Sequence, residues 1–387
     1  MMRFIIRERS KQVKKPTIID LFCGCGGISK GFSLAGFDVL LGIDNWSDAT
    51  TTYKHNFPNS ATITGDITAV NTKNIIDAIG NRQVDVIVGG PPCQGFSLSG
   101  KRMIDDERNV LYKSFVNIVS EMQPTVFVME NVPGLLRLFG GQIGDQVVND
   151  FSAIGYTVKK KILSADDYGV PQKRQRVFFV GLRTSSFENP DIYEYPKPEF
   201  GPESKYSHVT TKDAISDLDF VPEDKSLGEI IEYGLPPQTD YQKTMRKNSK
   251  KLHNHSITVH TEKTRQIISM VPDGGNYKSL PKDLWDTRKV NIAWTRMNSK
   301  KPCFTIDTGH NHHFHYNANR VPTARESARI QSFPDDFVFL GGKTSQLKQI
   351  GNAVPPLLAQ ALAKSIKHIL KDKATTCTTQ QDNIDVQ

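Results

Sequence analysis

A cysteine in a turn is the first residue whose type and setting suggest chemistry. Cys93 lies in GGPPCQGFS (89–97), directly after the apolar run VDVIVGG (84–90). Most lone cysteines are inert packing residues. Here, however, two prolines before the thiol and a Gln-Gly pair after it disfavour burial in a regular helix or strand. A thiol in such a turn becomes a nucleophile where neighbouring positive charge stabilises the thiolate, and we favour that interpretation.

A glycine-rich turn follows the first apolar run of the chain. The segment DLFCGCGG (20–27) ends the run TIIDLF (17–22), and glycines there let the backbone turn sharply and approach a ligand. Asp44 ends the second predicted strand, and Asp66 follows Gly65 after a short third strand expected between the apolar runs 38–43 and 84–90. Carboxylates at these places can accept hydrogen bonds from ribose hydroxyls and an adenine amino group. Each Asp could instead cap a helix. Together, beside the turn, they favour a ligand that contains adenosine.

The elements that must position these residues alternate along the chain. Near-continuous apolar runs, rich in Val and Ile, indicate buried parallel strands at 17–22, 38–43, 84–90, 125–130 and 176–182. Helix-like segments lie between them at 28–35, 46–56, 72–79 and 110–121. We therefore predict an α/β fold with a doubly wound, mostly parallel sheet, whose carboxyl edge holds the ligand.

The chain has 387 residues, a length that favours two domains. Its composition changes along the sequence and suggests where the parts divide. After about residue 183 proline becomes dense and the alternation stops, which predicts a smaller irregular domain. The predicted parts are a basic N-terminal extension (1–15), a catalytic and cofactor-binding domain (16–182), the irregular domain (183–315), a C-terminal part whose helix packs back on the catalytic domain (316–372) and a disordered tail (373–387).

Charge and cysteine content limit the partners and the compartment. The net charge is +8, and residues 240–301 hold 14 Lys and Arg against 5 Asp and Glu, so this segment either binds a polyanion or is a solvated face. Five cysteines, an odd number, argue against a disulfide framework, and no apolar run is long enough to span a membrane. We expect a cytoplasmic protein. The His-rich segment 310–315 lacks the ligand spacing of a zinc site, so we predict no metal.

The motifs, taken in order, resemble those of the DNA cytosine-5 methyltransferases. Beyond DLFCGCGG and PPCQ, the resemblance lies in MENV (129–132), PQKRQR (171–176), RESARIQSFPD (325–335) and QIGNAVPP (349–356). It covers most of 17–182 and 320–368. It implies a Rossmann-like methyltransferase fold, with 183–315 as the target-recognition domain. It also implies methyl transfer from S-adenosylmethionine to carbon 5 of a cytosine that is flipped out of double-stranded DNA.

The resemblance assigns roles residue by residue. It implies that Cys93 adds to carbon 6 of the cytosine, that Glu130 acts at ring nitrogen 3, and that Arg176 contacts the base and orients Glu130. Arg174 and Arg176 match the paired arginines of the family, so the resemblance makes both catalytic candidates. Because they alternate in a strand, we expect both to point into the cleft. The implied cofactor-binding residues are Asp20, Phe22, Gly24, Gly26, Gly27, Asp44, Asp66, Ile67, Pro92, Leu111, Asn352 and Ala353. Candidate DNA contacts are Ser99 and Arg108 in the loop after the nucleophile, and Arg296 beside Trp294 and Met297.

The resemblance also implies a bacterial restriction-modification methylase, acting as a monomer and paired in function, without a stable complex, with a restriction endonuclease. Three alternatives remain at this point. An RNA cytosine-5 methyltransferase usually has a smaller recognition region than 183–315. An oxidoreductase that binds a dinucleotide would explain the glycine turn but not PPCQ, MENV and PQKRQR. A catalytically inactive DNA-binding relative would not need Cys93, Glu130 and Arg176 intact.

Overall fold

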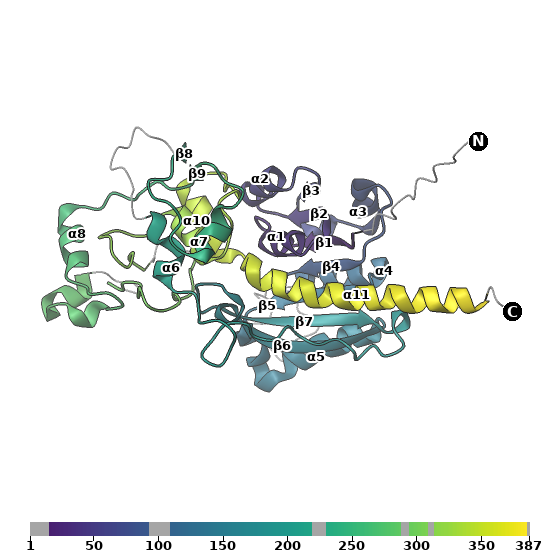
Figure 1. The fold of residues 1–387 in the computed structure, drawn as a ribbon. Coiled ribbons are helices and arrows are strands. Elements are labelled where there is room, and N and C mark those ends of the chain that lie inside the picture. The colour runs from purple at the N-terminus through teal and green to yellow at the C-terminus, as the bar shows by residue number, and fades with distance from the viewer. Residues whose placement is uncertain (1–14, 93–108, 219–229, 288–293, 309–312, 385–387) are drawn as a thin grey trace, which may run out of the picture.

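One mixed sheet forms the centre of the molecule (Figure 1). The computed structural model describes residues 15–92, 109–218, 230–287, 294–308 and 313–384, with side chains of the last helix as far as Lys371. The strand order is β3-β2-β1-β4-β5-β7-β6, with bounds β1 (Thr17–Leu21), β2 (Asp38–Asp44), β3 (Ala61–Thr64), β4 (Val86–Gly89), β5 (Val126–Asn131), β6 (Tyr156–Ser164) and β7 (Gln175–Arg183).

Strand pairing confirms the predicted mostly parallel sheet. Strands β3, β2, β1, β4 and β5 pair in parallel, and β7 pairs antiparallel with β5 and β6. Each predicted strand overlaps an observed one. Strand β6 was not predicted, because its sequence YTVKKKILS has no continuous apolar run. As an edge strand it has only one neighbour, and exposed lysines are tolerated there.

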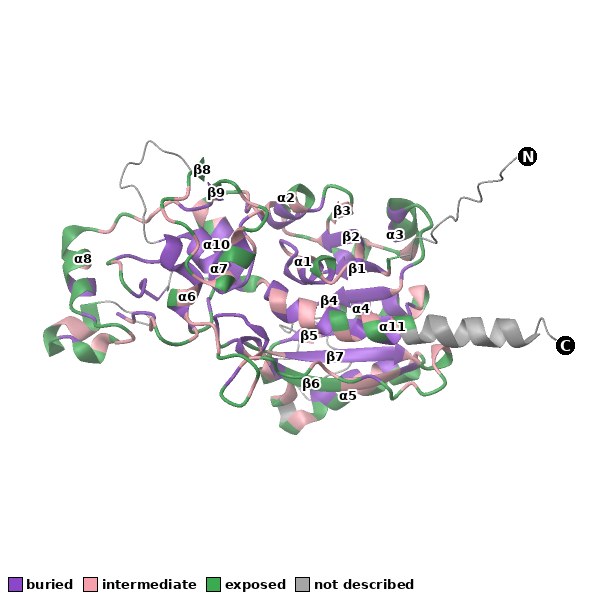
Figure 2. Cartoon of the chain, viewed as in Figure 1, coloured by how far each residue is buried: buried purple, intermediate pink, exposed green. Residues whose placement is uncertain are grey.

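Helices cover both faces of the sheet. The first four, α1 (Gly27–Leu34), α2 (Ser47–Asn56), α3 (Thr72–Ile79) and α4 (Val110–Met122), match the predicted helices to within one residue at each end, and α5 (Gln142–Ala153) was not predicted. Successive side chains of a strand point to opposite faces. Accordingly Ile18 packs in a cluster with residues of α1, α2 and the last helix, and Ile19 packs in a second cluster with residues of α3, α4 and α5. Figure 2 shows the buried strands between these layers.

The variable region 183–315 contains only short elements among its described residues. They are α6 (Thr211–Ile215), α7 (Asp240–Arg246), α8 (Glu262–Ser269) and the paired two-residue strands β8 (Ile230–Ile231) and β9 (Leu252–His253). A small apolar cluster includes Ile268, Trp294 and Phe314. Tyr193 and Ala214 instead pack in the large cluster that contains Ile18. The region thus has a small core of its own and is also anchored in the core of the sheet domain.

Three helices complete the chain: α9 (Ala324–Ile330), α10 (Lys343–Asn352) and α11 (Pro356–Ile384). Helix α11 packs along α1, as the sequence predicts (Figure 1). The structure differs from the predicted disordered tail at 373–387, because α11 continues to Ile384. Neither Gly nor Pro occurs after Pro356 to end the helix earlier. Within the described ranges, no helix is both long and apolar enough to cross a membrane.

Candidate active site

A cavity of about 450 Å³ opens at the carboxyl ends of β1, β2, β4 and β5. Ligands of open α/β sheets bind at this edge. Ten of the twelve predicted cofactor residues line it, and they are Phe22, Gly24, Gly27, Asp44, Asp66, Ile67, Pro92, Leu111, Asn352 and Ala353. Glu130 lines the same cavity. The structure therefore brings the predicted cofactor residues and one predicted catalytic residue to a single space.

The turn between β1 and α1 forms the floor of this cavity and has unusual backbone angles. The φ angle is 66° at Phe22, 52° at Gly24 and 102° at Gly26. Glycine adopts such angles without strain, whereas a phenylalanine does not, and strained residues of this kind cluster at functional sites. Gly24 and Gly27 line the cavity. Gly26 caps α1 and is not part of the lining, so its role lies in the turn itself.

Two carboxylates of the lining also hold local backbone. Asp44 Oδ2 accepts a hydrogen bond from the Gly24 amide at 2.8 Å, and its Oδ1 accepts one from the Trp46 amide at 2.9 Å. Asp66 Oδ1 accepts from the Thr68 amide at 2.9 Å and caps a short 3-10 helix. The capping role considered from the sequence thus exists at Asp66. Each carboxylate keeps further acceptor capacity for a ligand.

Asp20 differs from its predicted role as a cofactor contact. It is 1% exposed beneath the turn and does not line the cavity. Its Oδ2 accepts a hydrogen bond from Ser29 Oγ at 2.6 Å, and its Oδ1 has no partner among the described residues. Burial raises the pKa of the Asp20 carboxyl to about 7, against the opposing effect of the Ser29 hydrogen bond. Asp20 therefore supports the turn from below.

Glu130 and Arg176 form an ion pair at the edge of the cavity. Arg176 Nε lies 2.8 Å from Glu130 Oε1, and both side chains are largely buried. Burial raises the pKa of the Glu130 carboxyl, and the nearby Arg176 and Arg174 oppose that shift. The space is tight, because a Cβ at Gly90 would lie 2.7 Å from Glu130 Oε2. The carboxyl is thus held in one orientation by Arg176 and by the tight space around it.

Arg174 does not point into the cleft with Arg176, as we had expected from their alternation. Its guanidinium is 1% exposed and donates to the backbone oxygens of Ile306 at 3.1 Å and Gly351 at 2.7 Å. The expectation was wrong because Arg174 precedes β7, which begins at Gln175, so the strand's alternation does not extend to it.

The predicted nucleophile lies just beyond a described segment. Cys93, Ser99 and Arg108 fall outside the described residues, and Pro92 is the last residue before that gap. Asn131 Nδ2 donates to the Pro91 oxygen at 3.0 Å. The segment that leads to Cys93 is therefore fixed to the end of β5, beside Glu130.

The structure does not support Arg296 as a base reader. The side chain is 4% exposed, and its guanidinium donates to backbone oxygens of Ile268, Val271, His315 and Ala318 and to the side chain of Asn319. Trp294 and Met297, the aromatic and apolar candidates beside it, are also buried. Trp294 packs in the small core of the variable region and Met297 in the large cluster that contains Ile18, which is the usual role of apolar residues spaced as in a strand.

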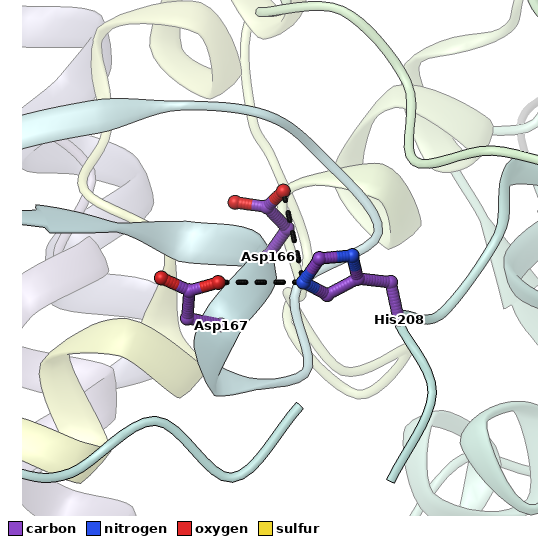
Figure 3. Close-up of side chains that lie close together, drawn as sticks. All are labelled: Asp166, Asp167 and His208. Carbon is purple, nitrogen blue, oxygen red and sulfur yellow. Dashed lines mark hydrogen bonds and ion pairs between the residues drawn. The ribbon is translucent and has the colours of Figure 1, made fainter. Parts of the chain in front are cut away.

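One group of side chains has the residue types that bind metal ions (Figure 3). His208 Nε2 lies 3.3 Å from Asp167 Oδ1 and 4.0 Å from Asp166 Oδ2, so both dashed lines meet at one ring nitrogen. Asp166 Oδ1 also accepts from Ser164 Oγ at 2.5 Å. The contact with Asp167 fits a hydrogen bond that attaches residue 208 of the variable region to the 3-10 helix after β6.

The cavity contains two notable residues that the sequence analysis missed. Trp46 lines it two residues after Asp44, and the Lys348 ammonium lies 4.7 Å from the centre of the Trp46 ring. An aromatic residue two positions after a strand-end carboxylate was a usable signal for Trp46. Lys348 comes from α10, more than 300 residues further along the chain. Its position depends on tertiary structure, and a pattern in one sequence does not show it.

Comparisons with known proteins agree with this geometry. The family model of C-5 cytosine-specific DNA methylases matches residues 16–368. The chain is 41% identical to Type II methyltransferase M.DdeI of Desulfomicrobium norvegicum over 371 residues, which cover 90% of this chain and 88% of the relative. It is 38% identical to Type II methyltransferase M1.HphI of Haemophilus parahaemolyticus, over 90% of this chain and 86% of the relative.

A solved structure shares the fold over nearly the whole chain. It is described as a DNA modification methyltransferase encoded within an E. coli prophage, and it matches with a TM-score of 0.75 and 29% identity over 92% of this chain and 100% of that chain. The DNA enzyme is supported over the RNA alternative, and neither a dinucleotide oxidoreductase nor an inactive regulator is supported. The chain belongs to the C-5 cytosine-specific DNA methylases and is a DNA cytosine-5 methyltransferase.

Proposed function

We propose that the cavity binds S-adenosylmethionine and that the target cytosine meets the cofactor at the Glu130 end. One observation carries this proposal. A single cavity is lined by Asp44 at the end of β2, Asp66 shortly after β3, and Glu130 of β5. A cofactor at the Asp44 and Asp66 end and a base at the Glu130 end would therefore share one cavity.

The residues present fit this cofactor in charge and shape. Two carboxylates, Asp44 and Asp66, line the proposed cofactor end of the cavity, and Lys348 is the single cation among the described lining residues. This excess of negative charge suits a sulfonium ligand. The apolar walls suit an adenine ring, and they come from Phe22, Trp46, Ile67, Pro92 and Leu111. When bound, the cofactor supplies an electrophilic methyl group.

The side chains divide the remaining chemistry between them. The Cys93 thiolate would add to carbon 6 of cytosine, which makes carbon 5 nucleophilic. Glu130 would donate a proton or a strong hydrogen bond to ring nitrogen 3, where negative charge develops. Its raised pKa supports this role, because the donor must be protonated. Arg176 holds Glu130 Oε1 at 2.8 Å and so fixes the direction of the donor.

Access to the base requires flipping, since carbon 5 and carbon 6 are shielded in a stacked duplex. We assign closure over the flipped base to the loop that carries Ser99 and Arg108, and choice of target sequence to 183–315. The motifs of the resemblance support the first assignment, and the domain-sized length of the variable region supports the second.

The named relatives extend the proposal to a biological setting. Those reported above are named Type II methyltransferases, and the resemblance in the sequence implies a restriction-modification setting. We assign this chain the same role: a monomer that methylates cytoplasmic double-stranded DNA and protects it from a restriction endonuclease without a stable complex.

Calorimetry with S-adenosylmethionine tests the cofactor site. Asp44→Ala removes a carboxylate that both fixes the glycine turn and faces the cavity, so affinity should fall about tenfold or more. Asp38→Ala is the matched control, because Asp38 begins the same strand and pairs with Arg82 at the surface. The control should bind like the unmodified protein. Equal affinity in both variants would remove Asp44, and with it this cavity, from the cofactor site.

A further inference from the structure

Three buried side chains connect the segment before β7 with the wall of the cavity formed at the end of α10. Gln172 and Gln331 are 0% exposed and Arg174 is 1% exposed, and we call these three residues the buried seam. We propose that the buried seam positions the cavity wall at Asn352 and Ala353, and that Arg174 affects catalysis only through this wall. The inference deepens the proposed function, since it rests on the cavity being the cofactor site.

The first connection runs through Arg174. One terminal nitrogen donates to the Gly351 oxygen at 2.7 Å and the other donates to the Ile306 oxygen at 3.1 Å. Gly351 directly precedes Asn352 and Ala353, which line the cavity. The arginine fork therefore holds the backbone of the wall at a fixed distance from the segment that leads to Arg176.

The second connection runs through the two glutamines. Gln172 Nε2 donates to Gln331 Oε1 at 2.7 Å, and Gln172 Oε1 accepts from the Ile306 amide at 2.9 Å. Gln331 Nε2 then donates to the oxygens of Ile350 at 2.7 Å and Ala353 at 3.2 Å. Both ends of the cavity wall are thus bonded from inside the protein. Both glutamine side chains are buried, so their amides have little freedom to find other partners.

Residues of the wall also lie in close contact with the glycine turn. A Cβ at Gly27 would lie 2.3 Å from the Val354 oxygen and 3.1 Å from the Ala353 Cβ. The Cys25 thiol also contacts the Gln349 oxygen at 3.6 Å. A displacement of the wall would therefore move the turn that shapes the floor of the cavity.

The surroundings of Arg174 separate it from a catalytic role. Among the described residues, no carboxylate lies within ion-pair distance and Nε has no hydrogen-bond partner. Burial is also the main cause that lowers the pKa of Arg174 to about 9. Burying a charged guanidinium is unfavourable unless hydrogen bonds compensate. Here the compensating acceptors are the backbone oxygens of Gly351, beside the cavity wall, and of Ile306.

Steady-state kinetics with duplex DNA and calorimetry with S-adenosylmethionine test the seam. Arg174→Lys keeps the charge but loses the fork, and Gln331→Met keeps the volume but loses the amide. Each should raise the KM and the Kd for the cofactor about tenfold, with kcat at saturating cofactor within about twofold of the unmodified enzyme. Arg183→Lys is the matched control: Arg183 ends the same strand and donates to the Gln123 oxygen, far from the wall. It should leave both constants unchanged.

The outcomes separate the roles. A fall in kcat with unchanged cofactor KM in Arg174→Lys would make Arg174 a catalytic residue and overturn the inference. Unchanged cofactor Kd in both seam variants would overturn it as well, while loss of affinity in Asp44→Ala alone would leave the proposed function standing. Melting temperatures show whether each variant folds, and if Arg174→Lys does not fold, Gln331→Met decides.

Discussion

The sheet domain and the variable region use their charged side chains differently. Around the cavity, Asp44, Asp66 and Glu130 keep carboxylate oxygens at an open space. In the variable region, Arg296 is enclosed by backbone oxygens, and Asp217 is 1% exposed and pairs with Arg246 and with Arg329 of α9. In the first region the polypeptide leaves polar capacity for a ligand. In the variable region, Arg296 and Asp217 already have hydrogen-bond or ion-pair partners within the protein.

This difference shows which sequence signals locate function. A charged residue at the carboxyl end of a parallel strand lies where the fold itself leaves a crevice. A charged residue in an irregular segment often replaces missing secondary structure, because the backbone oxygens of irregular segments need donors. Arg176 and Arg296 illustrate the two cases: one holds Glu130 at the cavity, and the other replaces strand and helix hydrogen bonds.

Removing the proposed nucleophile should have the largest effect. Cys93→Ser should lower methyl transfer by at least about 10⁴-fold, because a hydroxyl is a far weaker nucleophile. Cys303→Ala is the control from the variable region, since Cys303 is a buried thiol away from the cavity. It should keep its rate. The checks are radiolabelled methyl transfer and covalent trapping on DNA with 5-fluorocytosine, and a trapped complex with the serine variant would contradict the assignment.

Arg296→Met should chiefly change stability. The substitution leaves four backbone oxygens without their donor, so the free energy of unfolding should fall by about 3 kcal/mol or more. Arg265→Met removes an exposed arginine of α8 and should change it by about 0.5 kcal/mol or less. Urea unfolding measures both. If Arg296→Met instead keeps its stability and loses discrimination between DNA sites, Arg296 contacts a base and the contrast between the two regions fails.

Asp20 should give the sheet domain a pH-dependent stability. Its pKa is raised from 3.8 to about 7 in the folded protein, so the native state binds a proton that the unfolded state has lost. The stabilisation is therefore fully present below pH 3.8 and is lost as pH rises through about 7, with a slope of up to about 1.4 kcal/mol per pH unit. Asp20→Asn should remove this slope in urea unfolding between pH 5 and pH 7. The same slope in both proteins would assign the titration to another group.

Much of the sheet domain could be predicted from the sequence, because its signals are local. Continuous apolar runs mark strands buried on both faces, and glycines with Asp44 and Asp66 mark strand ends. Strand β6 escaped prediction because an edge strand needs no apolar run. Cys93, Ser99 and Arg108 lie outside the described residues, so their roles stay predictions.

The contacts that depend on distant parts of the chain could not be predicted. Arg174 and Arg176 have the same residue type two positions apart, yet one holds Gly351 and the other holds Glu130. The two arginines have different partners because β7 begins between them and because α10 packs beside Arg174. The motif PQKRQR predicts neither feature. Lys348 reaches Trp46 by the same kind of long-range packing.

Bisulfite sequencing of unmethylated duplex DNA, treated with the purified protein and S-adenosylmethionine, tests the central claim most directly. The account predicts that one cytosine within a single short sequence resists conversion wherever that sequence occurs, and that DNA treated with Cys93→Ser shows no such position. Full conversion of every cytosine in the DNA, with labelled methyl groups transferred to RNA instead, would contradict it.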